Sequence, residues 1–175
     1  MSTRKSKGNT AAAAAEVLER FHDRYAGPAL PVPVDEIAED LLGLLVEEDD
    51  SLTVSGMLVP AERHILLNGR EARQSAGRRR FTLAHEIGHW VCQVEKGSKE
   101  SRYCRSEEIG MGAGRALERE ANAFAADLLM PEALVRSEAA SLRLNVHALA
   151  RRFGVSVPAM KVRLGALDLL PPYMR

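Results

Sequence analysis

Residues 81–90 read FTLAHEIGHW, and the five residues from His85 to His89 form the pattern HExxH. Helical residues four positions apart are separated by about 400° of rotation and about 6 Å of rise, so both imidazoles project from one face. One metal ion can then bind both rings. The pattern predicts a helix over 78–94, and its two apolar stripes indicate that this helix is buried on two sides.

Glu86 follows His85 directly and is rotated by about 100° from it along the predicted helix. Its carboxylate therefore does not share the position of the imidazoles but reaches a water molecule at the metal. Zinc lowers the pKa of such a water toward about 7, and a neighbouring carboxylate can accept the proton. We predict that His85 and His89 bind the metal and that Glu86 is the catalytic base. The alternative is that both histidines lie in the core and bond to the backbone.

A catalytic zinc site needs a third protein ligand and an open position. The extended pattern HExxHxxGxxH is absent, because Cys92 and Glu95 stand where its glycine and third histidine would be. The best source of the ligand is a helix predicted over 115–130, which Pro131 ends. Glu118 and Glu120 flank the apolar stripe of this helix on opposite sides, so the helical wheel does not choose between them.

The rest of the chain predicts an α+β fold in which a small antiparallel sheet packs on these two helices. Short apolar or β-branched runs at 44–47, 54–59 and 64–67 predict the strands. Helices are expected over 11–25 and from about residue 35, after a disordered basic tail over 1–10. The arginine-rich segment 70–80 is interpreted as a solvated loop that leads into a charged first helical turn.

The C-terminal stretch 145–170 has the pattern of a helix-turn-helix, with Asn145 and Ser156 as expected helix N-caps. Its expected core is apolar, and residues 141–175 carry an excess of basic side chains. DNA binding is therefore one interpretation, but a structural or protein-docking role is favoured. The expected core residues are Leu149, Phe153, Val155, Met160 and Leu164.

Length and composition set limits on the class of protein. The 175 residues are enough for one domain with a small appendage, and 24 basic residues balance 24 acidic ones. Net charge therefore gives no general argument for nucleic acid or an anionic membrane as the partner. Two cysteines form no disulfide framework, and no apolar run approaches the roughly 20 residues that span a bilayer, so a cytoplasmic location is expected.

FTLAHEIGHW together with EREANAFAADLLMP (118–131) resembles the ImmA/IrrE family of metallo-endopeptidases. The resemblance covers roughly residues 15–135 and includes PVPVDEIAEDLLGL (31–44) and LLNG (66–69). It implies two histidines and a glutamate as ligands of zinc, with manganese as the alternative ion. The family's pattern maps best onto Glu120, so the resemblance favours Glu120 over Glu118 as the third ligand.

The resemblance also implies a function. The expected domains are a metallopeptidase at 11–135 and a helical extension at 136–175. The expected substrate is a helix-turn-helix repressor, whose cleavage would switch on genes of a mobile element or a stress response. An edge strand of the sheet could bind an extended substrate by strand addition. The alternative is a DNA-binding or protein-binding regulator, of the kind found in toxin-antitoxin pairs, with a structural or idle metal site.

Some residues outside the motif have two interpretations each. Cys92 is expected to be a small buried residue rather than a ligand. Tyr103 could donate a hydrogen bond to an oxyanion, but an ordinary loop aromatic is an equal expectation. His64 and His147 are expected to have no catalytic role, and Cys104 has no assigned role.

Overall fold

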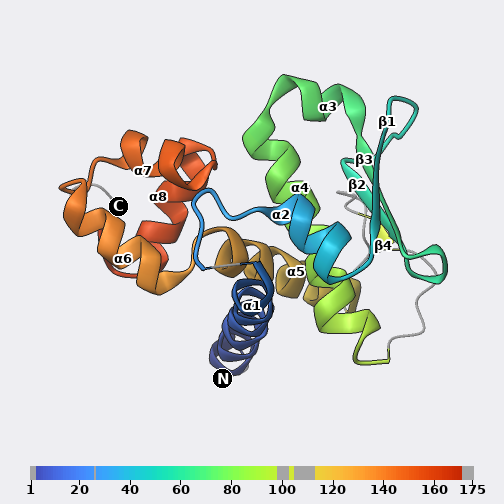
Figure 1. Cartoon of the computed structure of the whole chain (residues 1–175), viewed down its shortest axis with the longest axis horizontal. Helices are drawn as coiled ribbons and strands as arrows, with labels where there is room; N and C mark the ends of the chain where they lie inside the picture. Colours follow the sequence, from blue (N-terminus) through green and yellow to red (C-terminus); the bar gives the residue numbers. More distant parts are fainter. Residues whose placement is uncertain (1–2, 26, 98–102, 105–112, 171–175) are drawn as a thin grey trace.

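The computed structural model describes residues 3–25, 27–97, 103–104 and 113–170, and the side chains of 9–25, 27–97 and 114–170. The fold is α+β, as predicted (Figure 1). The helices are α1 (Thr3–Tyr25), α2 (Val34–Glu36), α3 (Gly69–Gln74), α4 (Ala76–His89), α5 (Ala113–Leu129), α6 (Glu132–Ser141), α7 (Val146–Phe153) and α8 (Val157–Ala166). Segments η1 (Ile37–Leu41) and η3 (Trp90–Val94) are π-helical and η2 (Pro60–Glu62) is a 3-10 helix. The strands are β1 (Leu45–Asp49), β2 (Gly56–Val59), β3 (His64–Asn68) and β4 (Tyr103–Cys104).

The sheet is mixed rather than wholly antiparallel. Its strand order is β1-β3-β2-β4, and β1 pairs in parallel with β3 while β2 is antiparallel to β3 and β4. The chain passes from β1 to β2 without pairing the two and then returns along β3, which occupies the place between them. Because β3 reverses the direction of β2, it runs in the direction of β1. Runs of apolar residues show that strands exist but not which strands are neighbours.

Helix α4 lies at the centre, with the sheet on one side and α5 packed across it on another (Figure 1). The two helices approach most closely at Gly88 and Ala121. A Cβ atom at position 88 would lie 3.1 Å from both the Cα and the carbonyl oxygen of Ala121. Such a contact is tighter than a side chain normally tolerates, so Gly88 allows the two backbones to pack closely.

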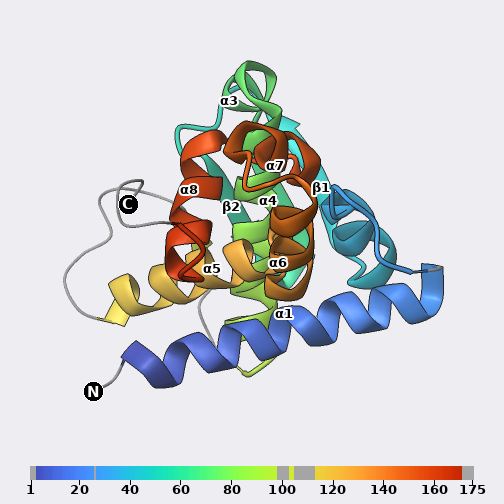
Figure 2. The ribbon, with the colours of Figure 1, turned by 90° about the vertical axis from the view of Figure 1, so that its left-hand side faces the viewer.

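Helix α1 runs across the base of the molecule and packs against α5 (Figure 2). It begins at Thr3, so the disordered tail predicted over 1–10 is helical for most of its length. Thr10 is fully buried, and its hydroxyl donates a hydrogen bond of 3.0 Å to the Asp127 carboxylate on α5. The composition of the tail does not reveal this, because the contact joins residues 117 positions apart.

The loop predicted at 70–80 is wrong, although Arg70, Arg73 and Arg78 are exposed as expected. Segment 69–74 is the helix α3, and α4 begins at Ala76. Arg79 pairs with Asp35 and Glu48 at 2.8 and 2.7 Å, and Arg80 donates to the carbonyl oxygens of Val32 and Gly154. These partners come from distant parts of the chain, so the arginines hold α4 in place instead of facing only water.

The C-terminal helices form the predicted helix-turn-helix arrangement at the end of the molecule away from the sheet (Figures 1 and 2). Asn145 and Ser156 cap α7 and α8 as expected, since their side chains accept hydrogen bonds from the backbone of Ala148 and Ala159. All five expected core residues of this unit are buried. The domain boundary predicted at 135/136 falls inside α6, which begins directly after Pro131. Among the described helices, none is long and apolar enough to cross a membrane.

Candidate metal centre

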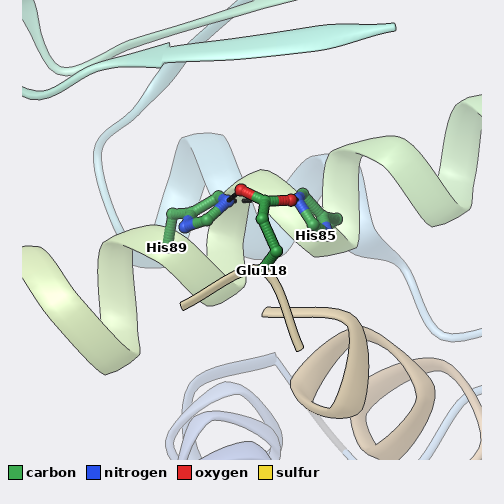
Figure 3. A group of neighbouring side chains, drawn as sticks. All are labelled: His85, His89 and Glu118. Atoms are coloured by element: carbon green, nitrogen blue, oxygen red, sulfur yellow. Dashed lines mark hydrogen bonds and ion pairs between the residues drawn. The ribbon is translucent and has the colours of Figure 1, made fainter. Parts of the chain in front are cut away.

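His85 and His89 lie one turn apart on α4 and are both fully buried. Their Nε2 atoms face each other at 3.0 Å, and the ring planes are nearly perpendicular at 83° (Figure 3). The spacing that the HExxH pattern predicts is therefore present. Both imidazoles turn the same nitrogen toward one point in space.

The carboxylate that meets them belongs to Glu118, not to Glu120. Its two oxygens lie 3.2 Å from Nε2 of His85 and 3.1 Å from Nε2 of His89 (Figure 3). The ligand atoms of these three residues all lie within 4.8 Å of one another. The family resemblance favoured Glu120 as the glutamate beside the histidines, and the structure places Glu118 there instead.

The packing of α5 explains this correction. Ala121 is the residue of α5 that contacts Gly88 on α4, and Glu118 lies three residues before it, on the same face of the helix. Glu120 is two residues after Glu118, so it is rotated by about 200° from it. The charge of Glu120 acts on Cys92 instead, where burial first and this charge second raise the pKa of the thiol to about 11.

Asn122 was missed by the sequence analysis although a signal for it was present. It follows Glu118 by four residues and so shares its face of α5. Its Oδ1 lies 3.1 Å from Nδ1 of His85. An amide oxygen only accepts, so this contact places a proton on Nδ1, and in the neutral imidazole Nε2 then keeps the lone pair that can bind a metal.

Gln93 does the same for His89. Its Oε1 lies 2.7 Å from Nδ1 of His89, and its Nε2 donates to the carbonyl oxygen of Leu117 at 3.1 Å. Gln93 is buried, and its two hydrogen bonds connect η3, which follows α4, to the N-terminal part of α5 beside the two histidines. Both imidazoles are thus oriented by neutral amides rather than by carboxylates.

Replacing Gln93 by leucine is expected to weaken zinc binding by about 10–100-fold, because His89 loses the acceptor that fixes its orientation. Competition with a chromophoric zinc chelator measures this affinity. Gln74→Leu, at an exposed glutamine of α3, is the matched control and should leave it unchanged. Equal affinities for the two variants would show that Gln93 does not orient His89.

The contacts between the three side chains shift the pKa values of Glu118 and His89 in opposite directions. Burial by itself would raise the pKa of Glu118, but hydrogen bonds from His85 and His89 outweigh it and lower the pKa to about 2. Burial by itself would lower the pKa of His89, but the hydrogen bond to Glu118 and the charge of Glu86 outweigh it and raise the pKa. The carboxylate is therefore ionised at neutral pH, and cations are attracted to its oxygens.

Glu86 is fully buried beside the three residues and lies against strand β2. A Cβ atom at Gly56 would be 2.7 Å from Oε1 of Glu86 and 2.5 Å from the methyl group of Thr82. Only a glycine leaves room for the carboxylate at this point of β2. The strand therefore passes directly over the predicted catalytic base.

The other sequence-based expectations have mixed outcomes. Cys92 is buried and 5% exposed, as expected for a core residue. His64 pairs with Glu47 on the sheet, away from the metal centre, and His147 is exposed on α7. Tyr103 and Cys104 form β4 opposite Leu58 and Met57, but their side chains lie outside the described residues.

Two imidazole nitrogens and a carboxylate match the donor set of catalytic zinc sites that keep a fourth position for water or substrate. The chain matches the family model of the IrrE N-terminal-like domain, Peptidase_M78, over residues 50–165. The chain belongs to the Peptidase_M78 family. The matched range contains all four of His85, Glu86, His89 and Glu118, so the site lies within the part of the chain that defines membership of the Peptidase_M78 family.

A solved transcriptional regulator of Mycobacterium tuberculosis has the same fold as this Peptidase_M78 member. The TM-score is 0.66 at 24% sequence identity, and the alignment covers 95% of this chain and 49% of that one. This chain thus spans about half the length of the regulator. The comparison with curated proteins found no match.

Proposed function

We propose that this protein is a zinc-dependent endopeptidase that cleaves another protein. The observation that carries the proposal is the convergence of His85, His89 and Glu118 beside the buried carboxylate of Glu86. Membership of a peptidase family supports it. A site that only stabilised the fold would have no need of a fourth, acidic group beside its ligands.

His85, His89 and Glu118 would hold the metal. Zinc at such a site polarises a carbonyl group and lowers the pKa of water. Glu86 would accept the proton of the attacking water and pass it to the leaving amine. Asn122 and Gln93 keep the two imidazoles in the tautomer that binds metal, because their amide oxygens accept from Nδ1.

The sheet would bind the substrate backbone. β2 passes over Glu86 at Gly56, and β4 pairs with Met57 and Leu58 on its outer side. An extended polypeptide that adds to this side of the sheet would pair with the outer edge of β4, on the same side of the sheet's order as β2 and Glu86. Figure 3 shows that a strand of the sheet runs above His85 and His89 along α4. Backbone pairing of this kind tolerates many side chains.

We further propose that the substrate is a helix-turn-helix transcriptional repressor. Its cleavage would derepress genes of a mobile element or a stress response.

The second candidate is a regulator that binds DNA or protein with an idle metal site. The name of the Mycobacterium tuberculosis regulator and the helix-turn-helix arrangement of α7 and α8 favour this candidate.

Metal removal separates the two functions. The zinc-loaded protein is incubated with purified helix-turn-helix repressors, including any encoded beside its own gene, and the products are read by mass spectrometry. We expect one repressor to be cut at a single position, with cleavage stopped by 1,10-phenanthroline and restored by added zinc.

The control is binding to operator DNA, measured by gel shift with and without the chelator. If the zinc-loaded protein cleaves no repressor, the proposal that its substrate is a repressor is contradicted. Specific DNA binding that persists after chelation, without any cleavage, would favour the regulator instead.

A further inference from the structure

A groove of about 570 Å³ lies between α5 and α8, close to the metal centre. Side chains from the beginning of α4 and from α1 complete its walls, and most of its lining is apolar. This size is within the range of sites that bind ligands or short segments of chain. Its apolar lining includes Phe81, Ala126, Met130, Val162 and Ala166.

The groove adjoins the site described above through Asn122. Asn122 lines the groove and at the same time holds Nδ1 of His85 at 3.1 Å. Phe81, which also lines it, lies one helical turn before His85 on α4. The groove therefore lies next to His85, on the side of the N-terminal half of α4.

Two of the three charged groups that line the groove, Asp127 and Arg163, are paired with each other, and the third, Glu132, pairs with Arg136 outside the lining. Asp127 accepts from the hydroxyl of Thr10 at 3.0 Å and from Nη1 of Arg163 at 2.8 Å, and Arg163 also donates to the carbonyl oxygen of Met130 at 2.9 Å. The side chains of Arg163 and Asp127 are only 11% and 13% exposed. Because the charges of Asp127 and Arg163 offset each other, this part of the groove favours apolar side chains of a bound polypeptide over charged ones.

The rim of the groove presents an apolar side chain to solvent. Val162 on α8 is 74% exposed, the highest value among the exposed large hydrophobic residues of the described chain. Such a residue beside an apolar groove is typical of a surface that binds a partner. Arg163, by contrast, is held against α5 and is not presented to a phosphate backbone.

We propose that this groove binds an apolar stretch of the polypeptide substrate, next to the scissile bond, and that α8 forms one wall of the substrate site. The inference rests on the proposed peptidase function. It gives the C-terminal helix-turn-helix arrangement a role in selecting the substrate. Two or three residues of the substrate beyond the cleaved bond would fill the groove.

The first test uses a tryptic digest of denatured serum albumin as the substrate of the zinc-loaded full chain. Mass spectrometry of the products gives the residues around each cleaved bond. We expect leucine, isoleucine, valine, phenylalanine and methionine to be enriched about threefold or more at one of the three positions on one side of the bond. The same preference should appear at the cleavage site of any repressor that the protein cuts.

The second test uses variants of the groove. Val162→Asp places a charge at the rim and Ala166→Trp fills the groove from α8, and both should raise KM for an apolar peptide from the digest by about tenfold, with kcat unchanged. Leu45→Asp is the matched control, since Leu45 is 52% exposed on β1, away from the groove. All three variants should retain wild-type zinc content.

A readout without turnover uses the Glu86→Gln protein and the same peptide labelled with fluorescein. Fluorescence anisotropy should show about tenfold weaker binding when Val162→Asp is added, and no change when Leu45→Asp is added.

Several outcomes would overturn the inference. Cleavage without an apolar preference, or equal behaviour of Val162→Asp and Leu45→Asp, would overturn it while leaving the peptidase function intact. A concentration-dependent dimer that Val162→Asp abolishes without altering cleavage would assign the groove to a second copy of the chain. Cleavage of neither the digest nor any repressor would overturn the proposed function, and this inference with it.

Discussion

Replacing Glu86 by glutamine is expected to lower kcat by about 10²–10⁴-fold without loss of the bound metal. Glutamine has the shape of glutamate, so it fits the narrow space that Gly56 leaves beside position 86. It cannot accept the proton of the attacking water. The three side chains proposed to hold the metal are untouched, because Glu86 contributes no atom to the His85–His89–Glu118 group.

The measurement combines zinc content by atomic absorption with the rate of cleavage of a repressor or peptide. Glu95→Gln is the matched control, because Glu95 follows the same helix and accepts from the indole of Trp90 at 3.1 Å. This control should retain both the metal and the activity. If Glu86→Gln cleaves as fast as the wild type, Glu86 is not the base.

Replacing Glu118 by glutamine is expected to reduce zinc affinity by more than the roughly 10–100-fold that loss of an orienting hydrogen bond costs. The change removes the anionic group whose oxygens lie 3.2 and 3.1 Å from the two imidazoles. A neutral amide attracts a divalent cation much less than a carboxylate does. The loss follows from charge as well as from geometry.

Glu120→Gln is the matched control for this prediction. It makes the same chemical change two residues away, on a part of α5 that does not meet His85 or His89. Zinc should raise the Tm of the wild type and of Glu120→Gln, since binding to the folded state stabilises it, but not that of Glu118→Gln. Loss of the zinc effect in Glu120→Gln alone would restore the assignment that the family resemblance favoured.

The HExxH helix could be predicted from sequence because its signal is local. Residues 85–89 set the spacing of the imidazoles through the helical repeat alone, and the structure places their Nε2 atoms 3.0 Å apart. The caps at Asn145 and Ser156 are local in the same way, since each side chain bonds to a backbone group three residues ahead. The buried core of α7 and α8 follows from helical periodicity.

The third ligand could not be chosen from sequence because the choice depends on the rotation of α5 about its axis. That rotation is set where Ala121 meets Gly88 on α4, a contact between segments 33 residues apart. A helical wheel shows which residues share a face but not which neighbour the face meets. The polar pair Glu118 and Asn122, four residues apart, was the one local hint.

The sequence by itself determined the helix that carries the histidines and the class of fold, and it predicted Glu86 as the base, because periodicity and spacing act over a few residues. Only the tertiary structure decided that Glu118 lies beside the two histidines, that Gly56 makes room for Glu86, and that Arg79 and Arg80 are bound rather than solvated. Each of these depends on contacts between distant segments. Such contacts are set by the packing of whole elements, which no short stretch of sequence encodes.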